Sequence, residues 1–334
     1  MRRLSLATIA AALAAGPAYA QQPVIDMHVH AETVADYPPG MQYCIPLMAN
    51  EPVLDHSRPY VDQYGEAWFD AACDDPLVAV ETDEELLART IARLEANNAI
   101  ALLQGPPDRV RQWVAAAPDR FIPSLGFRIG RGDAYEDVEA MRELFANGGF
   151  VMLGEVTNQY HGIEPDDARM RPFWALMEEL DVPVGYHMGL GLPGVIAFYP
   201  DFRVSAGNPL LLEPVLHRHP DLRISIQHMA SGFHDELKMM LWSYPQLYVE
   251  ISGPITWSDD FHVYLRDLVD AGLAGRIMFG TDSLVWPEML DRSIAIIEEA
   301  DYLTDQQKHD ILFGNAVRFL ELDEAAMRAR AMGE

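Results

Sequence analysis

The chain has 334 residues, and its 51 acidic residues against 24 basic ones give a formal net charge of −27 at pH 7. So acidic a surface argues against nucleic acid or an anionic membrane as a partner. The length suffices for one large hydrophobic core, which α/β barrels commonly build as a single domain. We therefore expect a small-molecule substrate, and a homodimer stays open.

Residues 1–20 have the pattern of a secretory signal peptide. Arg2 and Arg3 precede an apolar run from Leu4 to about Ala15, and Ala18-Tyr19-Ala20 forms a small-residue cleavage site. The apolar run is too short to span a membrane. We predict cleavage after Ala20, a periplasmic or secreted location, and a single domain over residues 21–334.

The first predicted strand, Val24–His30, carries His28 and His30. Alternate residues of a strand point to the same face, so the two imidazoles would lie side by side. Such a pair is half of a metal site. A surface position near the end of the strand is the alternative for either histidine.

The segment 31–82 follows this strand and combines little periodicity with several prolines and many aromatic residues. We predict a long insertion loop that hangs over the same end of the fold as His28 and forms a lid or a wall of the substrate pocket. A dimer arm or a plain surface insertion is the alternative. The only cysteines, Cys44 and Cys73, lie in this segment, and after export a disulfide between them would close the loop. Two free buried thiols are the alternative.

From residue 83 onward, predicted helices alternate with short apolar strands. Strands that are apolar throughout suit a parallel sheet covered on both faces. Eight such units at this length predict an α/β fold, a (β/α)8 TIM barrel, with a doubly wound open sheet as the alternative. The later strands are predicted at Ala99–Leu103, Phe121–Phe127, Phe150–Glu155, Val182–Tyr186, Leu222–Gln227, Leu247–Ile251 and Arg276–Gly280. The helices are predicted at Leu86–Asn97, Arg109–Ala116, Tyr135–Ala146, Met170–Leu180, Pro209–His217, Phe233–Trp242, Phe261–Ala271, Glu288–Ala300, Thr304–Phe313 and Asn315–Leu320.

Polar side chains stand at the ends of four later strands: Glu155, His187, His228 and Asp282. The carboxyl ends of barrel strands open on one pocket, where these side chains would meet the two histidines of the first strand. Four imidazoles and two carboxylates are costly to bury without a cation. They are ligands that suit Zn²⁺, Mn²⁺ or Fe²⁺, and we expect one or two divalent ions, with Zn²⁺ as the first choice.

Several motifs resemble those of the amidohydrolase superfamily. They are Asp26-Met27-His28-Val29-His30, Gly185-Tyr186-His187, Gln227-His228, Phe279-Gly280-Thr281-Asp282-Ser283 and Ile311-Leu312-Phe313-Gly314-Asn315-Ala316. The set is most similar to the amidohydrolase-related (amidohydrolase 2) branch, which contains metal-dependent hydrolases, lactonases and non-oxidative decarboxylases.

The resemblance implies a TIM barrel whose metal is held by His28, His30, His187 and Asp282. It implies that His228 either binds a second metal or polarises the substrate. Many members bridge two metals with a carboxylated lysine on the fourth strand, where this chain has Glu155. Glu155 could take the bridging role of that lysine. The resemblance therefore leaves open whether the site holds one metal ion or two.

The leading functional hypothesis is a secreted metal-dependent hydrolase of a small ester, lactone or amide. Asp282 would accept a proton from metal-activated water and pass it to the leaving group, while a metal or His228 polarises the carbonyl. The alternative is a metal-dependent non-oxidative decarboxylase of an aromatic or unsaturated carboxylic acid. A non-catalytic binding protein is a third class. Arg128 and His161, on loops after the third and fourth strands, are weaker candidates for substrate contact, with a surface role as the alternative.

Overall fold

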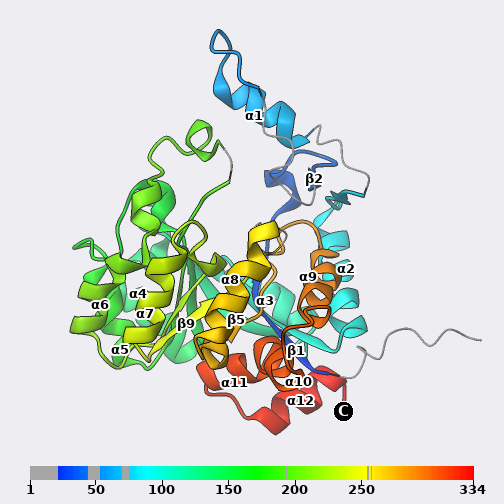
Figure 1. The fold of residues 1–334 in the computed structure, drawn as a ribbon, viewed down its shortest axis with the longest axis vertical. Coiled ribbons are helices and arrows are strands. Elements are labelled where there is room, and N and C mark those ends of the chain that lie inside the picture. Colours follow the sequence, from blue (N-terminus) through cyan, green and yellow to red (C-terminus); the bar gives the residue numbers. More distant parts are fainter. Residues whose placement is uncertain (1–21, 44–52, 70–74, 193, 254–255, 257) are drawn as a thin grey trace, which may run out of the picture.

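The computed structural model describes residues 22–43, 53–69, 75–192, 194–253, 256 and 258–334. These residues form a barrel of parallel strands surrounded by helices (Figure 1). The predicted signal peptide, Cys44 and Cys73 lie outside the described residues, so cleavage and the disulfide stay predictions. Among the described helices, none has both the length and the apolar character needed to cross a bilayer.

Eight strands lie side by side in the order in which they occur in the chain. The barrel closes where residues after the last strand pair with the first: Met27 N donates to Phe279 O (3.0 Å) and Asp282 N donates to His28 O (2.8 Å). This closure confirms the predicted barrel and excludes the open sheet. The strands are β1 (Val24–His30), β4 (Ala99–Gln104), β5 (Phe121–Phe127), β6 (Met152–Val156), β7 (Val184–Tyr186), β8 (Ile224–Ile226), β9 (Leu247–Glu250) and β10 (Ile277–Met278).

Helices follow the strands and cover the outside of the barrel (Figure 1). Their starts obey capping rules: the Thr82 hydroxyl accepts a hydrogen bond from Glu85 N at the start of α2, and Thr304 and Gln307 cap each other reciprocally at α10. The helix predicted to run to Phe313 ends earlier and continues as a π-helical turn, Asp310–Gly314. The helices after the insertion are α2 (Asp83–Ala96), α3 (Pro107–Ala116), α4 (Val138–Asn147), α5 (Arg171–Glu179), α6 (Glu213–Arg218), α7 (His234–Ser243), α8 (Asp259–Asp270), α9 (Met289–Glu298), α10 (Asp305–His309), α11 (Asn315–Phe319) and α12 (Glu324–Met332).

The hydrophobic core has two parts. The larger one lies between the strands and the helices, and the smaller one fills the inside of the barrel. In the smaller part, Ile25 and Met27 of β1 pack with Phe313 and Phe319 near the C-terminus. One end of the barrel is therefore sealed with apolar side chains, which leaves the other end for polar chemistry.

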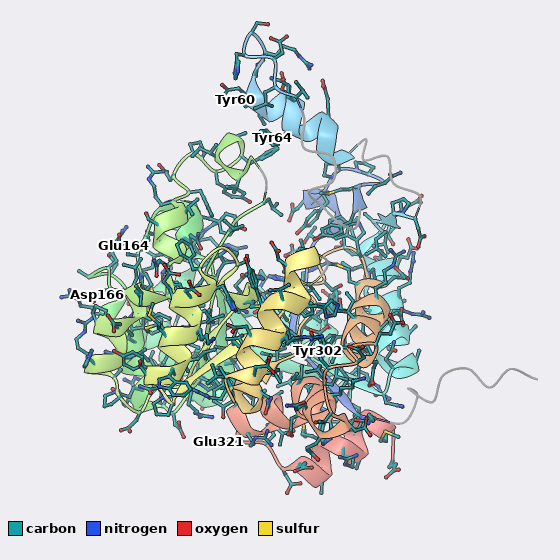
Figure 2. The ribbon with its side chains drawn as sticks, viewed as in Figure 1. Tyr60, Tyr64, Glu164, Asp166, Tyr302 and Glu321 are labelled. Atoms are coloured by element: carbon teal, nitrogen blue, oxygen red, sulfur yellow. The ribbon has the colours of Figure 1, made fainter. Side chains whose placement is uncertain are left out.

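The insertion after β1 is more ordered than predicted. It contains a helix, α1 (Tyr60–Phe69), and a small antiparallel ladder of β2 (Gln42–Tyr43) and β3 (Leu77–Val78). Figure 2 shows Tyr60 and Tyr64 on α1, which stands well away from the barrel body. Tyr64 packs against Gly194, in the loop after β7, so closely that a β-carbon at Gly194 would overlap the ring. β1 and β7 stand on opposite sides of the eight-stranded ring, so the insertion after β1 contacts a loop that follows a strand on the other side.

Candidate metal centre

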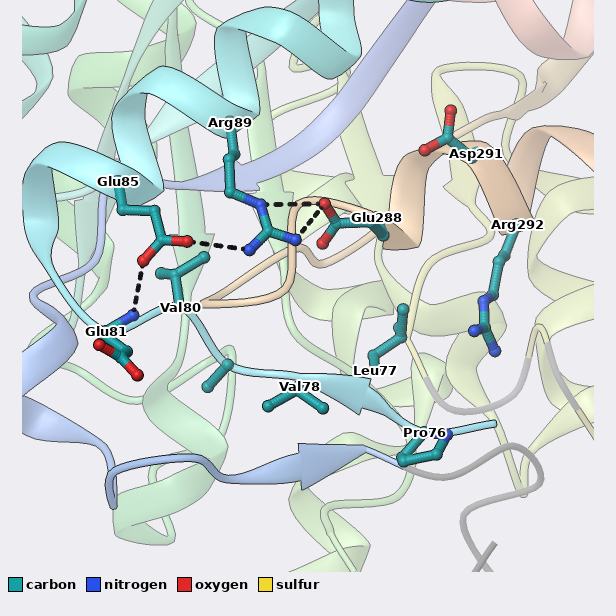
Figure 3. A pocket seen from close by; sticks show the side chains of 11 residues that line it. Pro76, Leu77, Val78, Val80, Glu81, Glu85, Arg89, Glu288, Asp291 and Arg292 are labelled. Atoms are coloured by element: carbon teal, nitrogen blue, oxygen red, sulfur yellow. Dashed lines mark hydrogen bonds and ion pairs between the residues drawn. The ribbon is translucent and has the colours of Figure 1, made fainter. Parts of the chain in front are cut away.

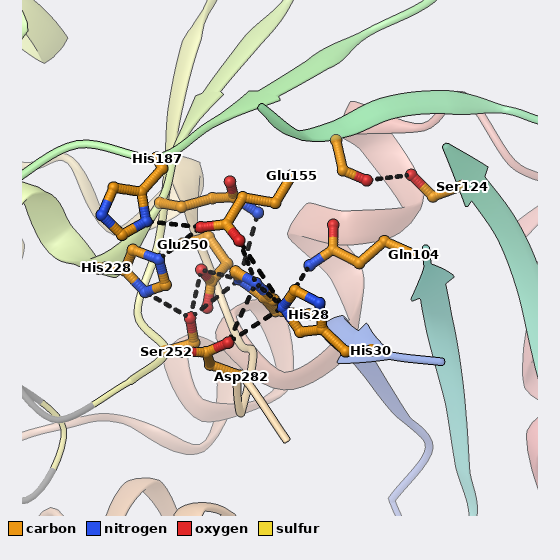
Figure 4. A network of polar contacts seen from close by, with 12 residues as sticks. His28, His30, Gln104, Ser124, Glu155, His187, His228, Glu250, Ser252 and Asp282 are labelled. Carbon is orange, nitrogen blue, oxygen red and sulfur yellow. Dashed lines mark hydrogen bonds and ion pairs between the residues drawn. The ribbon is translucent and has the colours of Figure 1, made fainter. Parts of the chain in front are cut away.

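The structure brings all six predicted site residues together at the open end of the barrel (Figure 4). Each comes from the carboxyl end of a strand or from the residues that follow it, as expected for a parallel barrel. β1 supplies His28 and His30, β6 supplies Glu155, and the loops after β7, β8 and β10 supply His187, His228 and Asp282.

One group of donor atoms comes from His28, His30 and Asp282. The His28 and His30 Nε2 atoms lie 3.0 Å apart, and the Asp282 Oδ1 atom lies 3.4 Å from the first and 3.1 Å from the second. Ligands of a tetrahedral zinc ion with bonds of about 2.05 Å stand about 3.3 Å apart. The three atoms therefore have the mutual spacing of ligands on one ion.

A second group gathers around Glu155. Its Oε1 atom lies 2.6 Å from His187 Nδ1 and 2.9 Å from His228 Nε2. Its Oε2 atom lies 3.7 Å from the Nε2 atoms of both His28 and His30. The two oxygens of one carboxylate thus face the two groups, which is the placement that a bridging ligand requires.

Glu250 and Ser252 belong to the site but were missed in the sequence. The Ser252 hydroxyl donates to Glu250 Oε2 (2.7 Å), which also lies 3.2 Å from His28 Nδ1. A carboxylate on Nδ1 fixes the tautomer of an imidazole and leaves the Nε2 lone pair for a metal. The signal for Glu250 was a carboxylate at the end of the apolar strand Leu247–Glu250, the same signal that identified Glu155.

The backbone at the site is held in an uncommon conformation. Asp282 and His228 have φ angles of 58° and 56°, in the left-handed region that non-glycine residues rarely adopt. Such a conformation costs on the order of 1–3 kcal/mol per residue and persists only where surrounding contacts enforce it. One such contact is Asp26, which accepts hydrogen bonds from the backbone N and the hydroxyl of Thr281 (3.0 and 2.7 Å). Asp26 thereby fixes the turn that presents Asp282.

The electrostatics of the cluster favour ionised carboxylates. Burial raises the pKa of Glu155, but the charge of His187 and hydrogen bonds from His187 and His228 outweigh it and hold that pKa well below its usual range. Burial likewise raises the pKa of Asp282, yet attraction to His28 and a hydrogen bond from His30 bring it below its ordinary value. Both side chains are therefore expected to carry negative charge at neutral pH.

Histidines are the only cationic side chains that contact these carboxylates in the described part of the chain. Among the described residues, no Lys or Arg makes a hydrogen bond or ion pair with Glu155, Glu250 or Asp282. Buried carboxylates without a cation are strongly unfavourable. Burial lowers the pKa of His28, but the charges of Asp282 and Glu155 outweigh it and raise that pKa, so the site attracts positive charge. The donor set of imidazole nitrogens and carboxylate oxygens fits a divalent cation.

The accessible side of the centre is formed by His30 and Asp282. Their side chains are 15 % and 21 % exposed, whereas those of His28 and Glu250 are 0 % and 1 % exposed. A cavity of about 260 Å³ opens beside it, with His30, Glu155, Gln104, Thr157 and Arg131 among its walls. A substrate would reach the cluster from this side.

Tyrosine side chains surround the opening. The ring centroid of Tyr160 lies 4.9 Å from that of His187 and 4.9 Å from that of Tyr199. Tyr37 and Tyr43 come from the insertion, and burial, reinforced by the charge of Asp282, raises the pKa of both phenols. These two phenols are therefore neutral at physiological pH.

A larger pocket, of about 680 Å³, lies elsewhere, between β3, α2 and α9 (Figure 3). The Arg89 guanidinium and Glu288 form an ion pair across it at 2.5 Å. None of the six predicted site residues lines this pocket, so it is separate from the centre.

A comparison with protein families assigns the chain. The family model described as Amidohydrolase matches residues 25–322. The chain belongs to this amidohydrolase family. The match covers the whole barrel and confirms the resemblance seen in the motifs.

The curated relatives of the chain include gamma-resorcylate decarboxylases. The protein from Rhizobium sp. (strain MTP-10005) is 26% identical over 275 residues, which cover 69% of this chain and 79% of the relative. The protein from Rhodococcus jostii (strain RHA1) is 28% identical over 263 residues, covering 63% and 75%.

Solved structures share the fold. An uncharacterised TIM-barrel protein from Bordetella bronchiseptica has a TM-score of 0.60 at 19% identity, with 93% of this chain and 100% of that one covered. A dihydroxybenzoic acid decarboxylase from Polaromonas sp. JS666, solved with bound manganese and the inhibitor 2-nitroresorcinol, has a TM-score of 0.53 at 18% identity, with 92% and 99% covered. At these identities the likeness shows the family's barrel and no more.

Proposed function

We propose that this chain is a metal-dependent, non-oxidative decarboxylase of an aromatic carboxylic acid that carries an acidic hydroxyl group. This choice reverses the order of the two hypotheses drawn from the sequence, where hydrolysis came first. The observation that carries it is the buried cluster of histidines and carboxylates beneath a mouth of tyrosine rings. The names of the curated relatives support decarboxylation over hydrolysis.

The tyrosines suit a flat aromatic substrate. Aromatic rings pair favourably with one another in edge-to-face and offset arrangements. Tyr160 is held between His187 and Tyr199, so its position relative to the cluster is fixed from two sides. A substrate ring that packs against Tyr160 would present its carboxylate toward His30 and Asp282.

The residues that would hold the ion are His28, His30, Asp282, His187 and His228, with Glu155 between the two groups. When bound, a divalent cation would supply the positive charge that draws an anionic substrate into this acidic centre. Zn²⁺ remains our first expectation from the ligand set, and Mn²⁺ is supported by the manganese in the Polaromonas structure.

Asp282 is the residue placed to move a proton. Its carboxylate is the most accessible of the cluster's acidic groups, and its low pKa keeps it ionised, so that it can accept a proton at the start of the reaction. It would take the proton from the substrate's hydroxyl group and deliver it to the ring carbon as the carbon–carboxylate bond breaks and CO₂ leaves. The hydroxyl is then reprotonated from solvent.

The insertion would serve as a lid over this reaction. Its helix α1 reaches the loop after β7 on the far side of the opening, and its residues Tyr37 and Tyr43 lie near Asp282. Excluding water from the site would favour proton delivery to carbon over competing hydrolytic chemistry.

Hydrolysis of an ester or lactone is the second candidate, and Glu155 favours it. Its two oxygens face the two donor groups, an arrangement that suits a pair of metal ions. Paired ions are common in hydrolases that activate water.

The test is to strip the protein with a chelator, restore Mn²⁺ or Zn²⁺, and supply hydroxybenzoic acids and aryl esters or lactones in parallel. We expect metal-dependent release of CO₂ from the acids. Acid release from esters or lactones without CO₂ would establish hydrolysis instead. Absence of both activities, together with no retained metal, would leave the non-catalytic class.

A further inference from the structure

Arg128 is exceptional among the basic residues of this chain. Of the Lys and Arg side chains in the described part of the chain, it alone makes no ion pair within 4.0 Å and no hydrogen bond. Its Nε atom is buried without a partner, although the chain carries 51 acidic residues. An unpaired, half-buried cation is unfavourable unless an anion completes it.

The carboxylates nearest to Arg128 are already engaged. Asp133 forms an ion pair with Arg131 (3.2 Å) and accepts a hydrogen bond from the Tyr135 hydroxyl (2.9 Å). Glu136 accepts from the backbone N of Gly130 and from other N–H groups of the same turn. Burial and the neighbouring charge of Arg131 lower the pKa of Arg128, which shows that these acids do not compensate it.

Arg128 stands at the open end of the barrel. It follows β5 directly. Alternate residues of a barrel strand face the interior, and Ser124 does so, because its hydroxyl donates to Met152 O and Gly154 O within the barrel. Gly126 and Arg128 continue this series of inward-facing positions. Gly126 and Phe127 line the cavity that also holds His30 and Glu155. By this alternation the Arg128 side chain is directed toward the open end of the barrel, next in sequence to Gly126 and Phe127 of the cavity wall.

A second unpartnered donor lies nearby on the neighbouring loop. His161 ends the 3-10 turn Asn158–His161 after β6, and its Nε2 atom is also buried without a partner. Burial and the charge of Arg128 lower the pKa of His161, with Asp201 as the opposing acid. The adjacent residue, Tyr160, is the one that packs on His187.

We propose that Arg128 and His161 form an anion-binding subsite at the barrel mouth, which selects substrates that carry a second carboxylate on the ring, away from the carboxylate held at the metal centre. This inference rests on the proposed function for its choice of an aromatic acid. Arg128 would bind the second carboxylate through charge-assisted hydrogen bonds, and the neutral His161 would donate one more. Tyr160 would carry the ring between the two anchors.

The experiment measures binding, by calorimetry on the metal-loaded full-length protein, of isophthalate, terephthalate and benzoate. One of the two dicarboxylates should bind the wild type about ten- to a hundredfold more tightly than benzoate, the range expected for one charge-assisted contact. Arg128→Gln should abolish that preference and leave benzoate binding unchanged, and Arg128→Lys should restore part of it. Arg142→Gln is the matched control, because Arg142 pairs with Glu179 on the outer helices.

Equal binding of all three ligands to the wild type would overturn the subsite, as would equal weakening of benzoate and dicarboxylates in Arg128→Gln. Circular dichroism and thermal melting check that each variant is folded. The failure of the proposed function looks different: dicarboxylates would still depend on Arg128 while no aromatic acid releases CO₂. Conversely, if Arg128→Gln changes the rate of CO₂ release for none of the acids tested, the proposed subsite is refuted and the proposed decarboxylase function stands.

Discussion

Glu250 offers a test of the metal centre that leaves the proposed ligands of both donor groups in place. Glu250 Oε2 accepts from Ser252 (2.7 Å) and lies 3.2 Å from His28 Nδ1, and the residue is 1 % exposed. Glu250→Gln keeps the shape and one acceptor oxygen but removes the charge. A charge-assisted hydrogen bond of about 1.5–3 kcal/mol then becomes a neutral one of about 1 kcal/mol. The loss of about 1–2 kcal/mol corresponds to about five- to thirtyfold weaker metal binding, close to the effect of removing carboxylates that orient metal-binding histidines.

The assay is a competition titration of Zn²⁺ and Mn²⁺ against a chromophoric chelator. The control is Glu178→Gln, because Glu178 makes the same kind of contact with His219 Nδ1 (2.7 Å) away from the centre. Unchanged metal affinity in Glu250→Gln, or an equal loss in Glu178→Gln, would refute the reasoning. A loss far beyond a hundredfold would instead make Glu250 a direct ligand, in the group His28, His228 and Glu250.

Two further variants examine the reaction. Asp282→Asn should lower kcat for CO₂ release by at least about a hundredfold, the usual contribution of a positioned proton-transfer group, while elemental analysis still finds metal; near-normal turnover would remove Asp282 from this role. Tyr160→Leu should raise KM for an aromatic acid by about two- to tenfold, the value of one aromatic contact, with a smaller change in kcat. Tyr302→Leu is its control, since Tyr302 stacks under Arg266 on the outside of the barrel, and an unaltered KM in Tyr160→Leu would place the substrate ring elsewhere.

The barrel and the six-residue cluster could be predicted because both follow from local patterns. Short apolar runs marked the strands, and barrel topology then brought their polar ends to one pocket. Glu250 also stands at the end of a short apolar strand, Leu247–Glu250, but was not predicted as a site residue. Helix α1 could not be seen in the same way, because Gly65 weakens its helical pattern and its described contacts, with β2 and with the distant loop after β7, form only on folding. The unpaired state of Arg128 is likewise invisible in sequence, since it depends on which hydrogen bonds Asp133 and Glu136 make after folding.

Asp26 links the stability of the fold to pH. Burial raises its pKa from 3.8 to about 7, against the hydrogen bonds from Thr281 and His28. A carboxyl group whose pKa is higher in the folded state than in the unfolded chain stabilises the fold at a pH below the pKa of the unfolded chain. This stabilisation is lost as the pH rises through the pKa of the folded state. For a shift of this size, the free energy of unfolding should fall by about 3 kcal/mol between pH 5 and pH 8.

Asp26→Asn should remove that dependence in the metal-free protein, because an amide does not ionise. The amide oxygen can still accept from Thr281 N and His28 N, and the Thr281 hydroxyl can turn to donate to His28 O (3.3 Å) while it accepts from the new amide. Urea unfolding of both proteins at pH 5 and pH 8 gives the measurement, and subtracting the two pH differences cancels the groups that the proteins share. Parallel pH profiles would show that Asp26 is ionised in the folded barrel at both pH values. The turn that presents Asp282 would then be held by a charged Asp26 carboxylate, and not by a neutral carboxyl group.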